Sequence, residues 1–149
     1  WQGVYGSNGY NVINGTVAYP SYVTVTPSGQ STANWTSSTT DVRALYTSAT
    51  STTRIAAAWY NPTTTFLIDL VFNDGNQHQL ALYCLDWDTT KRAETVTIQD
   101  ANGVLLNAQN MTNFHNGDYL VWQLSGHVQI LVTTATKSAN AVVSGLFFK

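Results

Sequence analysis

The stretch TFLIDLVFNDGNQHQLALYCL, residues 65–85, decides the fold class. In residues 65–72 every second side chain is apolar, which is the period of a β-strand with one buried face. Residues 79–85 are apolar at almost every position, as in a central strand covered on both sides. The glycine in the intervening segment, residues 73–76, can take the positive φ of a tight turn. We therefore predict an antiparallel β-hairpin.

The same composition recurs along the rest of the chain. Short runs rich in Val, Ile, Thr, Tyr and Phe alternate with clusters of Gly, Asn, Asp, Ser and Pro, as in sandwiches and barrels. Helix formers are scarce, and no window has the apolar spacing of a helix. We predict one all-β domain over residues 1–149, an antiparallel β-sandwich of about nine strands. Further strands are expected at residues 22–26, 54–60, 94–99, 104–106, 119–124, 127–133 and 140–148.

The surface should be polar but almost uncharged. Only 14 of the 149 residues are charged, whereas Thr, Ser, Asn and Gln together contribute 54. Six Lys and Arg residues and a net charge of −2 cannot form the basic surface that neutralises phosphates. We therefore expect a soluble protein with neither nucleic acid nor membrane as a partner. The single cysteine, Cys84, lies in an apolar run and is expected to be a core residue.

One predicted strand ends in two aromatic residues. Saccharides are recognised by flat rings against their C–H faces and by planar polar groups that pair with their hydroxyls. Trp59 and Tyr60 end the strand just before Asn61 and Pro62, so at least one ring should lie at a rim that carries loops. Both are candidate ligand-binding residues.

A second strand end combines an aromatic ring with charges. Trp87 lies between Asp86 and Asp88, and the alternation of a strand places both carboxylates on the face opposite the indole. Trp87, Asp88 and Arg92 are candidate ligand-binding residues. Asp88 and Arg92 could instead form an ion pair that closes the loop, and the sequence leaves both readings open.

A third candidate pair is Asp41 and Arg43, which share one face if this segment is extended. Arg43 could neutralise a half-buried Asp or bind adjacent sugar hydroxyls through its two-nitrogen edge. For Arg54 we favour the first role.

Four segments carry a resemblance to a known family: residues 3–13, residues 41–45, residues 82–88 and the terminal residues 141–148. In the order and the residue composition of these strands, the chain resembles discoidin-like or galactose-binding-like jelly-roll domains. Such carbohydrate-binding modules are appended to secreted bacterial polysaccharide-degrading enzymes. The resemblance implies an extracellular, non-catalytic domain of a larger multidomain enzyme. It implies no cofactor, and it is compatible with a structural Ca²⁺.

The leading hypothesis is a carbohydrate-binding module that stacks a neutral polysaccharide on Trp59 or Trp87 and concentrates a linked enzyme on it. A structural or adhesive sandwich that contacts other proteins is the alternative, and it predicts an exposed apolar patch on one sheet face. A small glycan-degrading enzyme is a third hypothesis. It would need a cleft with two carboxylates on either side of the scissile bond, and the only glutamate, Glu94, begins a predicted strand.

Overall fold

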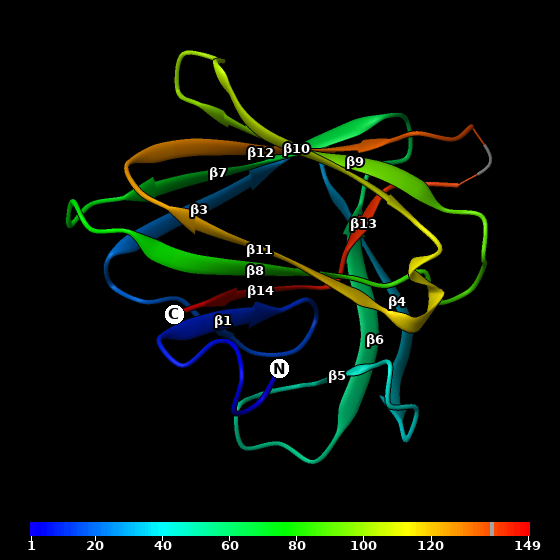
Figure 1. Ribbon diagram of the computed structural model, residues 1–149. Helices are drawn as coiled ribbons and strands as arrows, with labels where there is room; N and C mark the ends of the chain where they lie inside the picture. The colour runs from blue at the N-terminus through cyan, green and yellow to red at the C-terminus, as the bar shows by residue number, and fades with distance from the viewer. Residues whose placement is uncertain (138) are drawn as a thin grey trace.

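The computed structural model describes residues 1–137 and 139–149, whose regular secondary structure consists of β-strands and one short 3₁₀ turn, joined by loops (Figure 1). The described chain has more strands than the predicted nine because the expected strand 140–148 is divided into two, and because residues 9–12, 17–18, 31–39 and 45–46 also pair. The elements are β1 Gly9–Val12, β2 Val17–Ala18, β3 Val23–Ser28, β4 Ser31–Thr39, β5 Leu45–Tyr46, β6 Arg54–Tyr60, β7 Thr65–Phe72, β8 His78–Cys84, β9 Ala93–Asp100, β10 Leu105–Thr112, η1 Phe114–Asn116, β11 Asp118–Leu124, β12 His127–Thr134, β13 Val142–Val143 and β14 Gly145–Phe148.

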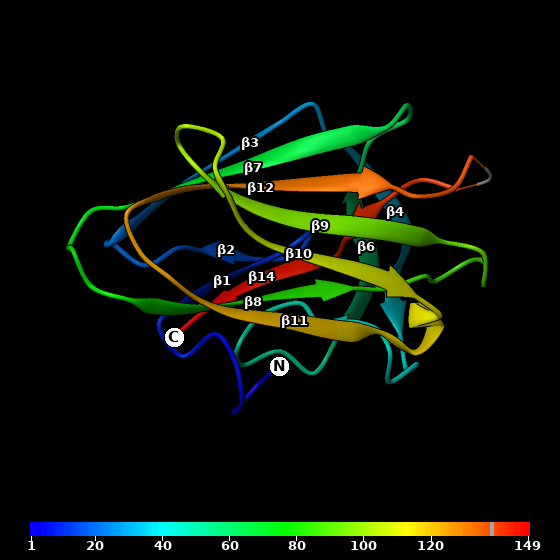
Figure 2. The same ribbon diagram turned by 45° about the horizontal axis from the view of Figure 1, so that its top comes forward.

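The strands form two large antiparallel sheets around one core (Figure 2). Sheet 1 has the order β11-β8-β14-β1-β2, and sheet 2 has the order β10-β9-β12-β7-β3. Leu80 and Leu82 of sheet 1 and Ile68 and Ile130 of sheet 2 are fully buried in the same core. The expected all-β antiparallel sandwich of jelly-roll type is confirmed.

The predicted hairpin over residues 65–85 is wrong, although both of its strands exist. β7 belongs to sheet 2, where it pairs with β12 and β3, and β8 belongs to sheet 1, where it pairs with β11 and β14. Gly75 does take a positive φ of 75°, but the turn carries the chain from one sheet to the other. The apolar faces of β7 and β8 belong to the same core, so each strand finds its hydrogen-bonding partners elsewhere.

Several other predictions from local patterns are confirmed. β8 is a central strand, and Cys84 at its end is fully buried. Val96 and Ile98 of β9 are fully buried, as their alternation with threonines requires. Gly103, in the turn after Asp100, takes a positive φ, and this turn joins β9 to β10, with which β9 is paired.

A third, smaller sheet has the order β13-β6-β4, with β5 also paired to β6. β4 and β6 run at a steep angle to the strands of the larger sheets (Figure 1). The pairing of β4 with β6 is interrupted between Asn34 and Thr36, so that Trp35 stands at a β-bulge. A bulge re-aims side chains, and bulges are frequent beside binding sites.

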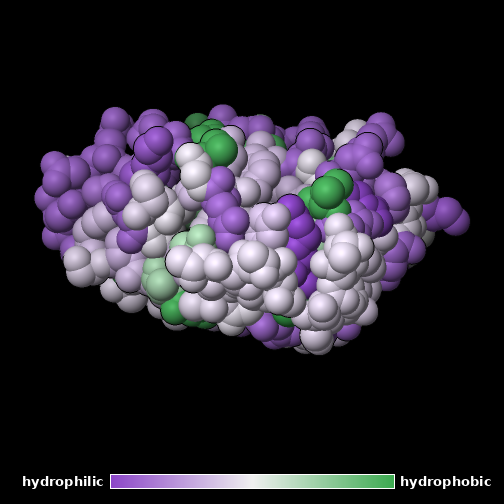
Figure 3. All heavy atoms as spheres, turned by 90° about the horizontal axis from the view of Figure 1, so that it is seen from below, coloured by the Kyte–Doolittle hydropathy of each residue, from purple (hydrophilic) through white to green (hydrophobic). Residues whose placement is uncertain are grey.

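The surface is mostly polar or of intermediate hydropathy, as expected. The face shown in Figure 3 carries only small, separate hydrophobic spots. No helix of the described chain has the length and apolarity that crossing a membrane requires.

Candidate functional site

A cavity of about 220 Å³, here called cavity A, lies beside the third sheet. Its aromatic walls come from β4 and β6, and its polar groups come from the loops before β9 and β13. The residues that line it are Ala33, Trp35, Tyr60, Asp88, Arg92, Asn140 and Val142. Cavity A thus brings together Tyr60 with Asp88 and Arg92, which were predicted from two separate segments.

Strand register places the aromatic side chains of cavity A. Tyr60 ends β6, where it is paired with Ser31 on one side and Val142 on the other. Ala33 is paired with Ala58, one side-chain repeat before Tyr60. Ala33 lines the cavity together with Trp35 and Tyr60, and its small side chain fills little of the space.

Arg92 is the polar centre of cavity A. Its Nη1 donates to Asp86 and to Asp88, and its Nε donates to the main-chain oxygen of Asn140 at 3.2 Å. The Asp86 side chain is only 2% exposed, whereas that of Asp88 is 49% exposed. The predicted ion pair between Asp88 and Arg92 is therefore present, with Asp86 as a second, buried partner.

Asp88 is held in its ionised form. Partial burial raises the pKa of its carboxyl group, but the hydrogen bond and the positive charge of Arg92 outweigh this effect and leave the pKa below its usual value. A side-chain hydrogen bond with Trp35 acts in the same direction. Asp88 is thus an acceptor anchored between the guanidinium and the indole.

Three polar side-chain groups of the residues that line cavity A make no hydrogen bond within the described ranges 1–137 and 139–149. They are Nη2 of Arg92, the side-chain amide of Asn140 and the hydroxyl of Tyr60. Guanidinium and amide groups can bind adjacent hydroxyls, and a phenol can donate or accept. The cavity therefore combines aromatic rings with free planar polar groups.

Trp59 is not an exposed platform, and the sequence-based expectation for its ring is wrong. Its side chain is 9% exposed and packs in the hydrophobic core. Neighbouring residues of a strand point to opposite faces, so Trp59 faces inward where Tyr60 faces cavity A.

Trp87, Asp41 and Arg43 gather in a separate cluster with His115. The guanidinium of Arg43 lies 4.7 Å from the centre of the Trp87 ring. Its Nε and Nη2 donate to the carboxylate of Asp41, and its Nη1 donates to Nε2 of His115 at 3.0 Å. These residues do not line cavity A.

This cluster ties loops together rather than presenting free groups. Nδ1 of His115 lies 2.7 Å from the main-chain oxygen of Asp86 and 2.8 Å from that of Thr89, so it carries the proton. The hydrogen bonds and charge of Arg43 lower the pKa of Asp41. All three side-chain nitrogens of Arg43 have hydrogen-bond partners. The geometry therefore supports a role for Arg43 in neutralising Asp41.

Arg54 does not neutralise an aspartate, contrary to expectation. Its Nη1 donates to the main-chain oxygens of Val42 and Ala44, and its guanidinium lies 3.7 Å from the centre of the Tyr46 ring. It lines a different, larger cavity.

Sequence analysis missed two residues of cavity A, Trp35 and Asn140. Trp35 is the only aromatic residue in the polar stretch 31–40. That isolation was a usable signal, because a tryptophan without apolar neighbours in its strand has no obvious core to join. Asn140 carries no such local signal.

The described residues contain no group of three or more His, Cys, Asp or Glu side chains that could hold a metal ion. Ca²⁺ also binds main-chain and amide oxygens, so a structural Ca²⁺ stays a prediction without assigned ligands. Glu94 is fully buried, and its Oε2 accepts a hydrogen bond from the main-chain N–H of Val142 at 2.7 Å.

Comparisons with known proteins find structural likeness only. No family model matches the chain, and no curated protein sequence does. The chain is similar to a family 35 carbohydrate-binding module from Clostridium thermocellum, at 16% identity, over 83% of this chain and 90% of the module, with a TM-score of 0.48.

It is also similar to an exo-β-1,3-galactanase from Phanerochaete chrysosporium, at 14% identity and a TM-score of 0.46, over 96% of this chain but 29% of the galactanase. The module TmCBM61, solved with β-1,4-galactotriose, is 8% identical over 87% of this chain and 88% of its own, with a TM-score of 0.45. A likeness of this degree transfers no ligand or residue role to this chain.

Proposed function

We propose that the protein is a non-catalytic carbohydrate-binding module and that cavity A holds a neutral sugar. The observation that carries this proposal is the combination of the rings of Trp35 and Tyr60 with the free polar groups of Arg92 and Asn140. A sugar ring packs its C–H face on an aromatic ring and pairs its hydroxyls with planar polar groups. The charge of Arg92 is already balanced by two carboxylates, which favours an uncharged ligand.

The size of cavity A favours one sugar unit in contact at a time. Its volume of about 220 Å³ lies below the ~300 Å³ at which pockets for drug-sized ligands begin. Further units of a polysaccharide would extend over the surrounding surface.

Binding rather than hydrolysis is favoured by the distribution of carboxylates. Glycosidases generally use two carboxylates on either side of the scissile bond. Asp88 is the one carboxylate among the described residues that line cavity A, while Asp86 and Glu94 are buried.

We also propose that the module acts outside the cell and concentrates a linked enzyme on its substrate, which requires only modest affinity.

The protein-docking alternative has less support. Among the described residues, the exposed large apolar side chains comprise the consecutive Val104, Leu105 and Leu106 near the edge strand β10, and isolated residues elsewhere. A run at one sheet edge is smaller than the apolar sheet face which that hypothesis requires.

The test is calorimetric titration of a panel of neutral polysaccharides and oligosaccharides with the wild-type protein and the variant Trp35→Ala. We expect binding of at least one glycan and a loss of at least about tenfold in affinity, since an aromatic contact contributes about 0.5–1.5 kcal/mol beyond its buried area, and the buried area of the ring is lost as well.

Trp122→Ala is the matched control, because Trp122 lies on β11 and does not line cavity A. The denaturation midpoint of each variant shows that it is folded. Equal affinity of Trp35→Ala and wild-type protein for the bound glycan would exclude cavity A as the site.

A further inference from the structure

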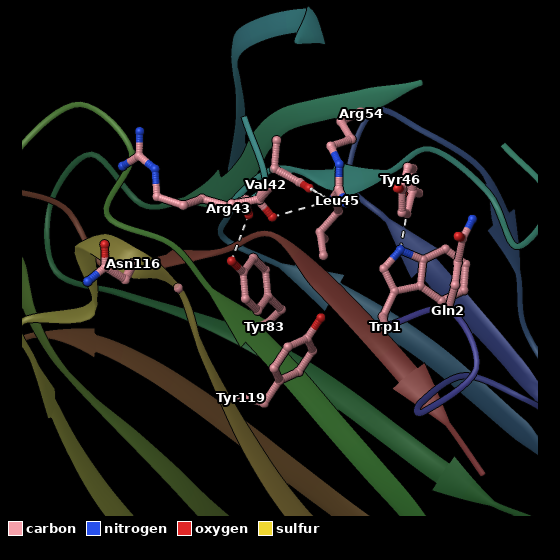
Figure 4. Close-up of a pocket in the computed structure, with 12 residues that line it drawn as sticks. Trp1, Gln2, Val42, Arg43, Leu45, Tyr46, Arg54, Tyr83, Asn116 and Tyr119 are labelled. Atoms are coloured by element: carbon pink, nitrogen blue, oxygen red, sulfur yellow. Dashed lines mark hydrogen bonds between the residues drawn. The ribbon is translucent and has the colours of Figure 1, made fainter. Parts of the chain in front are cut away.

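A second cavity, here called cavity B, has a volume of about 370 Å³ and lies beside the N-terminal segment, β5, and the ends of β8 and β11 that meet there. Its lining includes Trp1, Tyr46, Arg54, Tyr83 and Tyr119 (Figure 4). Neither the Trp35 ring nor any other residue of cavity A belongs to it.

Arg54 brings a positive charge to cavity B, and no carboxylate among the described lining residues balances it. Arg43 contributes its main chain, because its side chain points away from the cavity (Figure 4) and is hydrogen-bonded to Asp41 and His115. Burial raises the pKa of both Tyr83 and Tyr119, and the positive charge of Arg54, like that of Arg43 beside Tyr83, opposes this only in part. Both hydroxyls on this wall of the cavity therefore keep their protons.

The Arg54 guanidinium is held in place, but only one of its three nitrogens, Nη1, makes hydrogen bonds among the described residues. Stacking on Tyr46 and two hydrogen bonds from Nη1 hold it in place. Its Nε and Nη2 make no hydrogen bond within the described part of the chain. In Arg43 the corresponding Nε and Nη2 bind the carboxylate of Asp41 at 3.1 and 2.8 Å, and this two-nitrogen edge is well matched to a carboxylate.

The opposite wall supplies a free hydroxyl. Tyr83 donates its hydroxyl proton to the main-chain oxygen of Arg43 at 2.7 Å, whereas the hydroxyl of Tyr119 has no partner among the described residues. Figure 4 shows the Tyr119 hydroxyl directed into the space between Tyr83 and Trp1. Burial keeps the Tyr119 pKa above its usual value, so this hydroxyl retains its proton and can donate.

We propose that cavity B is a second binding site, selective for a ligand that carries a carboxylate. The Nε and Nη2 edge of Arg54 binds the two carboxylate oxygens, and Tyr119 donates to an oxygen of the same ligand. The ligand class is a small organic acid, of which a sugar acid is one source.

The test uses the two-dimensional NMR signals of the indole N–H groups in the whole chain. Trp1 donates its indole N–H to the Tyr46 main chain in cavity B, and Trp35 reports on cavity A. The probes are D-glucuronate, D-glucose as its neutral counterpart, and acetate as a carboxylate without a ring, all at equal ionic strength. We expect glucuronate to shift the Trp1 signal with at least about tenfold higher affinity than glucose, the equivalent of one charge-assisted hydrogen bond, and acetate to compete with it.

Two variants define the contacts. Arg54→Gln should reduce glucuronate affinity at least about tenfold, and Tyr119→Phe, which keeps the packed ring, should reduce it about threefold to tenfold. Tyr119→Phe keeps the proposal testable if Arg54→Gln does not fold. Trp35→Ala is the control and should leave glucuronate binding unchanged, so the two cavities can fail independently. Equal affinity for glucose and glucuronate, no competition by acetate, or unchanged affinity in both variants would overturn the proposal.

Discussion

Cavity A and cavity B are each lined by one arginine side chain, Arg92 and Arg54, but these two side chains have different partners. Arg92 donates to two carboxylates, one of them buried. Arg54 stacks on Tyr46 and donates only to main-chain oxygens. The partners of an arginine, rather than its presence, therefore determine the charge that a cavity offers to a ligand.

The largest expected effect concerns Glu94, which lies behind cavity A and has no counterpart in cavity B. Burial raises its pKa from 4.5 to about 8, although the Val142 N–H, the Cys84 side chain and the charge of Arg92 act against this. Because the pKa is higher in the folded state, Glu94 contributes stability that is complete below pH 4.5 and is lost as the pH rises through about 8.

Glu94→Gln mimics the protonated side chain and should remove this pH dependence. We expect the free energy of unfolding of the wild-type protein to fall by at most about 5 kcal/mol between pH 4 and pH 9, and that of the variant to change much less. Urea denaturation at five pH values measures both curves. Parallel curves would show that Glu94 does not titrate in this range.

The next prediction removes one of the two carboxylates that balance Arg92. Asp86→Asn leaves the guanidinium of Arg92 with the half-exposed Asp88 as its remaining carboxylate partner and should lower the free energy of unfolding by at most about 3–5 kcal/mol. Asp88→Asn is the matched control, and we expect a change of at most about 1 kcal/mol because that carboxylate is half exposed. Denaturant melts at pH 6 measure both variants; similar losses in the two would mean that burial does not distinguish the carboxylates.

The asymmetry between the cavities was only partly accessible from sequence. Tyr60, Asp88 and Arg92 were found because strand ends and charges are local features. Trp35 was missed because its direction depends on a bulge in the pairing of β4 with β6, which joins residues far apart in the chain. Local pattern also could not tell a turn within one sheet from a crossing between sheets, so the pairing of β7 with β8 was mispredicted while the burial of both strands was predicted correctly.

The third prediction concerns Gly117→Ala, a substitution that should disrupt cavity B and leave cavity A intact. Gly117 lines cavity B with a φ of 81°, and an added Cβ would overlap the Tyr83 hydroxyl. Gly103 has the same φ with nothing within 4 Å of an added Cβ. Gly103→Ala should therefore cost about 1–2 kcal/mol from backbone strain alone, and Gly117→Ala at least about 1–3 kcal/mol more, from overpacking and from a ψ of 133° that lies outside the left-handed helical region.

Thermal denaturation measures these losses, and the Trp1 and Trp35 indole signals locate them. Only Gly117→Ala should move the Trp1 signal, because the displaced Tyr83 ring forms part of the same wall. If both glycine variants lose the same stability, the Tyr83 side chain moves to accommodate the added Cβ at Gly117 without a loss of stability, and the packing of this wall is not tight.

The smallest expected effect is the salt dependence of binding, and it compares the two cavities most directly. Mobile ions screen the attraction between Arg54 and a carboxylate in an open cavity, while a neutral sugar in cavity A offers no charge to screen. Raising the salt concentration from about 0.02 M to about 0.3 M should weaken glucuronate binding about threefold and leave neutral glycan binding unchanged, since the Debye length shortens from ~20 Å to ~6 Å. Titrations in sodium chloride at fixed pH measure both affinities on one preparation. A salt-independent glucuronate affinity would mean that the sugar ring, and not its carboxylate, is what cavity B recognises, and the contrast between Arg54 and Arg92 would then have no consequence for ligand choice.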